Sequence, residues 1–150
     1  GHSLYALGDL PGAERHLTRA VELEPENAAR ANANLQAAGV ADRVDLHLGD
    51  SRELLPRALE KENGIRVALL DASHLYDDVK REFEAVLPKL SDDALVIFDN
   101  TYRIAEDGED PRVNGFLRDM QGWYGGNLIN FEFVSWFTPG LVVWQKKAAL

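Results

Sequence analysis

The chain has 150 residues, 45% of them hydrophobic, and it carries 25 acidic against 16 basic side chains, a formal net charge of -9. This length predicts one domain with a real core, and the absence of cysteine excludes disulfide scaffolds, cysteine zinc sites and thiol nucleophiles. The negative charge disfavours nucleic acid and anionic membranes as partners, and the longest apolar run, residues 94–98, is too short to span a bilayer, so we expect a cytoplasmic protein.

The first quarter of the chain is open to two interpretations. In one, Arg15–Leu23 is a β-strand with alternate apolar side chains facing inward. In the other, residues 8–27 form a tetratricopeptide-like helix, and the chain is a nonenzymatic interaction module. Such repeats need neighbours to bury their faces, and the sequence holds no second copy, so we favour the strand.

The rest of the chain alternates helical and strand patterns and closes on two β-rich runs joined by a Pro-Gly turn. Strands that alternate with helices pair in parallel through right-handed crossovers. We therefore expect an α/β, doubly wound, mostly parallel sheet with a C-terminal antiparallel hairpin. In chain order, the predicted elements are helix Pro25–Ala38, strand Arg43–Leu48, helix Ser51–Lys61, strand Ile65–Leu70, helix Leu75–Leu90, strand Ala94–Phe98, helix Val113–Met120, and hairpin strands Asn130–Phe137 and Leu141–Gln145.

An acidic residue follows or closes each predicted parallel strand. These residues are Glu22 or Glu24, then Asp50, Asp71 and Asp99. Ligands of doubly wound sheets bind beyond the carboxyl ends of the strands, so we expect these carboxylates to mark the site. The alternative for each is that it caps the helix or turn that follows, and Asp50, which precedes Ser51, fits that role well.

Five segments together resemble the class I S-adenosylmethionine (SAM)-dependent methyltransferases. They are Val21–Glu26, Ala38–Val44, Leu48–Asp50, Leu69–His74 and Phe98–Asn100. The last two are similar to the metal-binding strand ends of O-methyltransferases of the catechol type. Asp71 and His74 also form an Asp-x-x-His pattern, which resembles the one in enzymes that methylate sugars of bacterial natural products. The resemblance implies a Rossmann-like fold and transfer of a methyl group from SAM to a hydroxyl of a small molecule.

The same resemblance implies a set of cofactor-binding residues. Gly1 and Ser3 look like the tail of the glycine-rich loop at the methionine end of SAM. Glu22 looks like the residue that accepts hydrogen bonds from the ribose hydroxyls, and Asp50 and Ser51 look like the residues beside the adenine. Asp71 would also lie beside the cofactor. Because the resemblance starts inside the glycine motif, we expect a single methyltransferase-like domain over residues 1–150 that lacks its first strand, self-associates and binds SAM weakly; a catalytically inactive fragment remains an alternative.

The resemblance further implies a catalytic and metal site at two neighbouring strand ends. Asp71, Asp99 and Asn100 would offer oxygen ligands, which suit Mg²⁺. His74 and Asp71 would act on the acceptor, with His74 as general base. Several other residues could line an acceptor pocket, although the aromatic ones more often form a core: Tyr102, Arg103, Phe131, Phe133, Trp136, Phe137 and Trp144.

Overall fold

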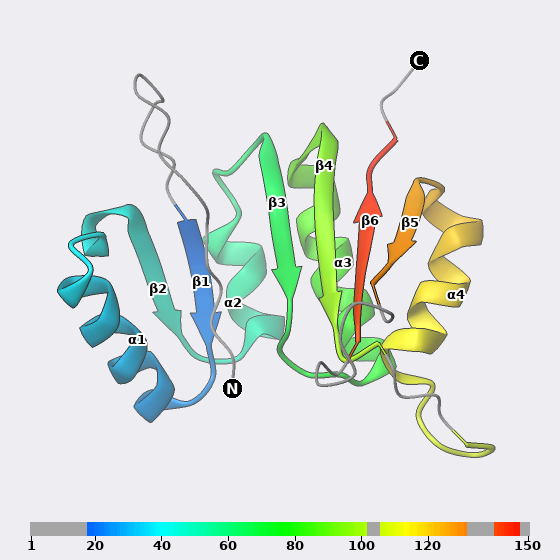
Figure 1. Ribbon diagram of the computed structural model, residues 1–150, viewed down its shortest axis with the longest axis horizontal. Coiled ribbons are helices and arrows are strands. Elements are labelled where there is room, and N and C mark those ends of the chain that lie inside the picture. The colour runs from blue at the N-terminus through cyan, green and yellow to red at the C-terminus, as the bar shows by residue number, and fades with distance from the viewer. Residues whose placement is uncertain (1–17, 102–105, 132–139, 148–150) are drawn as a thin grey trace. The chain divides into compact units, whose positions relative to one another are not determined.

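A computed structural model describes residues 18–101, 106–131 and 140–147 of the chain (Figure 1). The chain divides after Ala58 into two compact units, and each is described by itself. Among the described residues, no helix is long and apolar enough to cross a membrane.

The first unit contains two parallel strands and two helices. Strand β1 (Thr18–Glu22) pairs with β2 (Val44–Leu48). Helix α1 (Pro25–Ala37) begins at a proline and ends just before Gly39, whose φ of 70° is left-handed, and a short 3₁₀ turn (Ala41–Arg43) leads into β2. The strand at β1 contradicts the helical-repeat interpretation. Helix α2 (Ser51–Ala58) ends earlier than the predicted Lys61.

The second unit contains a four-stranded mixed sheet in the order β3-β4-β6-β5. The parallel pair is β3 (Ile65–Leu70) with β4 (Leu90–Asp99). Strand β6 (Leu141–Gln145) is antiparallel both to β4 and to the outer strand β5 (Asn127–Asn130). The mostly apolar runs of β3 and β4 produce the predicted parallel neighbours, and their carboxyl ends meet at the same edge of the sheet.

Helices α3 (Tyr76–Val86) and α4 (Arg112–Tyr124) contact each other and cover one face of this sheet (Figure 1). At the centre of the interface lies Phe83 of α3, which is fully buried. Its ring centroid lies 5.2 Å from that of Trp144, 5.5 Å from that of Phe116 and 5.9 Å from that of Phe98. Burying one such side chain contributes about 2 kcal/mol, so this aromatic cluster is a main source of the unit's stability.

Two predicted boundaries around α3 and β4 are wrong. The helix predicted to run from Leu75 to Leu90 ends at Val86, because Pro88 continues the chain as a 3₁₀ turn (Leu87–Lys89). Leu90 instead opens β4, so that strand begins four residues before the predicted Ala94 and ends one residue after Phe98.

The C-terminal hairpin also begins earlier than predicted. Its first strand is Asn127–Asn130, whereas the sequence predicted Asn130–Phe137, of which residues 132–137 lie outside the described part. Helix α4 extends past Met120 to Tyr124 and stops at Gly125, which has a φ of 63°. A Cβ on Gly126 would lie 2.3 Å from Trp144 Nε1, so the glycine pair lets the chain turn tightly against the core.

We expect Tyr76→Phe to remove one of the tyrosine ionisations that occur near pH 12. Burial, followed by the hydrogen bond to Asp119, raises the pKa of Tyr76 to about 12, and the Tyr76 hydroxyl donates that bond at 2.8 Å from α3 to α4. Neutral Tyr76 therefore stabilises the fold fully below about pH 10, and this contribution is lost as the pH rises toward 12. Near neutral pH the substitution should cost about 1 kcal/mol of unfolding free energy.

Absorbance at 295 nm across an alkaline titration, together with urea unfolding at pH 7, measures both effects. The matched control is Tyr124→Phe, because Tyr124 bonds Glu84 at 2.8 Å and its pKa is also raised to about 12. Each variant should lose one late ionisation and keep the other. A titration of Tyr76→Phe that matches the parent would contradict the expectation.

Candidate functional site

Two carboxylates converge at the carboxyl ends of β3 and β4. Asp71 directly follows β3, and Asp99 is the last residue of β4. The register pairs Leu70 with Phe98, so the two aspartates leave the sheet side by side. The convergence expected from the sequence is therefore present in the structure.

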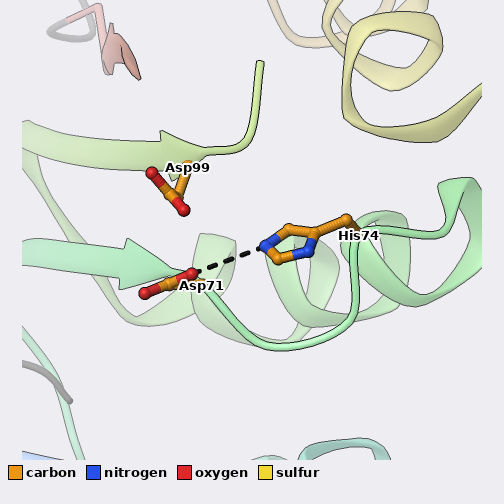
Figure 2. Close-up of side chains that lie close together, drawn as sticks. All are labelled: Asp71, His74 and Asp99. Atoms are coloured by element: carbon orange, nitrogen blue, oxygen red, sulfur yellow. Dashed lines mark ion pairs between the residues drawn. The ribbon is translucent and has the colours of Figure 1, made fainter. Parts of the chain in front are cut away.

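His74 completes a cluster with these carboxylates. Its ring lies in the loop between β3 and α3 and points toward the two aspartates, as Figure 2 shows. One ligand atom from each of Asp71, His74 and Asp99 lies within 4.8 Å of the other two, and His74 Nε2 lies 3.4 Å from Asp71 Oδ1. The His74 side chain is 28% exposed and that of Asp71 only 12%, so the imidazole is the more accessible group.

The two carboxylates influence each other electrostatically. Burial raises the pKa of Asp99, and the hydrogen bond and negative charge of neighbouring Asp71 raise it further. The nearby His74 lowers it to a smaller extent. Two acidic groups held this closely are stabilised by a shared positive charge or a shared proton.

Asn100 connects the end of β4 to the imidazole. Its side-chain nitrogen lies 2.8 Å from Nε2 and 3.0 Å from Nδ1 of His74. The backbone of Asn100 has a φ of 55°, a left-handed conformation that asparagine tolerates better than most residues. The amide can donate to whichever of the two ring nitrogens lacks a proton, so the bond it forms depends on the tautomer of His74.

The loop that carries His74 is held by contacts that the sequence did not predict. Ser73 Oγ donates a 2.6 Å hydrogen bond to Asp78 of α3. Asp110 Oδ1 accepts from the backbone N–H groups of Tyr76, at 2.9 Å, and Arg112, at 2.7 Å, so one carboxylate satisfies the first turns of both α3 and α4. The sequence does not predict this cap, because a cap supplied from another segment of the chain has no local pattern.

The cofactor candidates of the first unit have local partners. Glu22 Oε1 accepts a 2.9 Å hydrogen bond from the backbone N–H of Glu24. Asp50 caps α2 by accepting from the Arg52 N–H at 2.9 Å, and it also accepts from the Arg52 guanidinium. These bonds lower the pKa of Asp50 to about 2. Asp50 therefore performs the capping role, and Ser51 is the first residue of α2.

Two of the remaining candidate residues for the cofactor site and acceptor pocket lie in the described part of the chain. Trp144 is 1% exposed and belongs to the core, whereas Phe131 is 38% exposed. The others lie outside the described residues: Gly1, Ser3, Tyr102, Arg103, Phe133, Trp136 and Phe137.

The parallel strand pairs with intervening helices, and the acidic cluster at the strand ends of the second unit, define an α/β protein of the Rossmann-like class. A family profile described as "Methyltransferase domain" matches residues 1–101. The chain belongs to this methyltransferase domain family. No curated protein matches the chain significantly.

Solved structures share the same fold. A candidate O-methyltransferase from Klebsiella pneumoniae is 22% identical with a TM-score of 0.70, the match covering 88% of this chain and 62% of that one. An O-methyltransferase from Bacillus cereus in complex with SAH is 20% identical (TM-score 0.68; 87% and 63% covered). The O-methyltransferase TomG from Streptomyces achromogenes, involved in tomaymycin synthesis and crystallised with SAM, is 21% identical (TM-score 0.65; 88% and 62% covered). The chain thus spans less than two thirds of the length of these proteins.

Proposed function

We propose that this domain belongs to an enzyme that transfers the methyl group of SAM to a hydroxyl of a small molecule. The observation that carries the proposal is the Asp71, His74 and Asp99 cluster at the strand ends of a methyltransferase-family domain. The complexes of the Streptomyces enzyme with SAM and of the Bacillus enzyme with SAH support SAM as the cofactor.

The donor set of the cluster fits a divalent metal ion such as Mg²⁺. Asp71 and Asp99 offer hard oxygen ligands, and the ligand atoms of the cluster are within 4.8 Å of one another. Burial and the facing Asp71 raise the pKa of Asp99, and a cation held between the two carboxylates would offset their mutual repulsion. Asp71 and Asp99 would hold the ion, and Asn100 could add its amide oxygen. When bound, the ion would lower the pKa of an acceptor hydroxyl.

His74 would remove the proton of the acceptor hydroxyl. As the acceptor oxygen bonds the methyl carbon, the carbon–sulfur bond of SAM breaks and its electron pair returns to sulfur, which leaves as a neutral thioether. The hydroxyl proton moves to an unprotonated ring nitrogen of His74. The partial exposure of the ring lets an acceptor reach it.

The cofactor contacts of the first unit are part of the same proposal. Glu22 has a second carboxylate oxygen besides the one bonded to Glu24, and it would accept from the ribose hydroxyls. Asp50 and Ser51 would lie beside the adenine, and Gly1 and Ser3 beside the methionine end. Asp50 would serve there while it still caps α2, because a carboxylate offers about four acceptor positions.

A methyl-transfer assay with the complete enzyme tests this function. The enzyme is incubated with SAM labelled in its methyl group and with a panel of catechols, flavonoids and glycosides, with added Mg²⁺ or with a chelator. We expect labelled methyl ether from at least one hydroxyl acceptor and a large loss of product with the chelator. Label transferred only to amine or thiol acceptors would refute the proposed acceptor class, and no transfer at all would favour an inactive protein.

A further inference from the structure

The backbone that follows Asn100 is anchored on two sides. Thr101 is fully buried, and its carbonyl accepts a hydrogen bond from the side-chain amide of Asn114, which lies in the first turn of α4. The Thr101 N–H lies 3.5 Å from the carbonyl oxygen of Gly140, at the start of β6. Within the described part of the chain, the Thr101 hydroxyl has no hydrogen-bond partner. The hydrogen bonds that hold Thr101 are therefore those of its backbone.

These two contacts help to hold the backbone on the far side of Asn100. The Thr101 N–H belongs to the peptide group that links Asn100 to Thr101, and the Asn114 bond holds the Thr101 carbonyl, so together they restrict the torsions of Thr101. On the near side, Asp99 is held by its pairing with Leu141. Asn100 lies between these two held segments with a φ of 55°, which costs energy in a non-glycine residue unless its surroundings hold it. In this conformation the Asn100 side-chain nitrogen reaches the His74 ring at 2.8 Å.

We propose that Asn114 is a positioning residue for the site: through Thr101 it keeps Asn100 left-handed, with its amide nitrogen on His74. With its amide nitrogen at the His74 ring, Asn100 would have its amide oxygen available to join Asp71 and Asp99 as a ligand of the proposed metal ion. Asn114 donates to the Thr101 carbonyl, so it acts on the site through the backbone. The expected effect on metal binding rests on the proposed function, whereas the expected effect on the position of Asn100 does not.

Asn114→Asp tests the proposal, because it keeps the size of the side chain and removes the N–H donor. Asn127→Asp is the matched control: it makes the same chemical change at an exposed position of β5. Asn127 pairs with Gln145 of β6, and Asp99 pairs with Leu141 of the same strand. Because Gln145 and Leu141 are four residues apart, Asn127 lies about 13 Å along the strands from the site. If Asn114→Asp does not fold, Asn114→Ala provides the same measurement without a new charge.

Two measurements on the complete protein are made. The first is the ¹H–¹⁵N resonance of the Asn100 side-chain amide, assigned by its absence in Asn100→Ala. The second is the dissociation constant for Mn²⁺, a paramagnetic probe for the Mg²⁺ site, from electron paramagnetic resonance. We expect Asn114→Asp to shift the Asn100 amide resonance and to weaken Mn²⁺ binding about tenfold or more while the variant remains folded, with Asn127→Asp like the parent.

The outcomes separate this inference from the proposed function. An unshifted Asn100 resonance in folded Asn114→Asp or Asn114→Ala overturns the positioning role, whatever the metal does. A parent protein that binds no Mn²⁺ refutes the metal site of the proposed function, while a shifted Asn100 resonance still supports the role of Asn114. Equal Mn²⁺ affinity in parent and variant, where the parent binds, overturns the link between Asn114 and the metal site.

Discussion

Asp71→Asn is expected to lower the turnover of the complete enzyme by orders of magnitude and to leave its fold intact. The substitution removes one of the two carboxylates that converge within 4.8 Å at the ends of β3 and β4. In the proposed function this charge holds the metal ion that prepares the acceptor hydroxyl. Asp71 is the first residue after its strand, and an amide of the same shape keeps the packing there, so the melting temperature should change little.

His74→Ala should cost less than Asp71→Asn. A general base typically contributes about a hundredfold to ten-thousandfold in rate, and a metal-activated hydroxyl keeps part of its reactivity without the base. The matched control for Asp71→Asn is Asp77→Asn, which also replaces a carboxylate by an amide, but at an exposed position in the first turn of α3. We expect this control to retain the parent's kcat.

Steady-state kcat with and without chelator, beside thermal unfolding by circular dichroism, measures these effects. Asp71→Asn with the same kcat as the parent in both conditions would eliminate the site. A loss in His74→Ala larger than that in Asp71→Asn would assign most of the activation to the base and little to a metal ion.

The sequence predicts the strand ends of the second unit well because buried parallel strands are short apolar runs. The Ile65–Leu70 run ends in Asp71, and the run that closes β4 ends in Asp99, so the two residues that matter most stand at visible transitions. Parallel pairing then brings them together whatever the details of the loops. Element ends were less predictable: Leu90 fits the apolar stripe of α3, yet it opens β4.

What the sequence could not predict are contacts between segments distant along the chain. Asn114 bonds the carbonyl of Thr101, and Asp110 bonds the first residues of both α3 and α4. These bonds depend on where α4 docks, which no local pattern encodes. A weak signal was present for Asn114: a polar amide two residues into a helix, between the buried Val113 and Gly115.

The 150-residue chain by itself is expected to self-associate and to bind SAM weakly or not at all. Strand β3 pairs with β4 on one side only, and no described strand pairs with its other edge. Val67 on this strand is 56% exposed, which is unusual for a valine in a sheet. An edge strand with an exposed apolar side chain is a template for pairing with another chain, and a β-branched side chain such as valine favours added strands.

Weak cofactor binding follows from what the chain offers to SAM. The chain spans only 62% of the Streptomyces enzyme that was crystallised with SAM, so part of that protein has no counterpart in the match.

Isothermal titration with SAM and light scattering of the chain by itself decide the matter. We expect no micromolar binding and a mass of about twice the monomer or more. Val67→Lys should restore the monomer, because a lysine on an edge strand opposes pairing. Ile129→Lys is the matched control, since Ile129 is 48% exposed on β5, the short strand at the opposite edge of the same sheet. Association abolished by the control but not by Val67→Lys would assign it to β5, and micromolar SAM binding by a stable monomer would show that this edge of β3 matters for neither property.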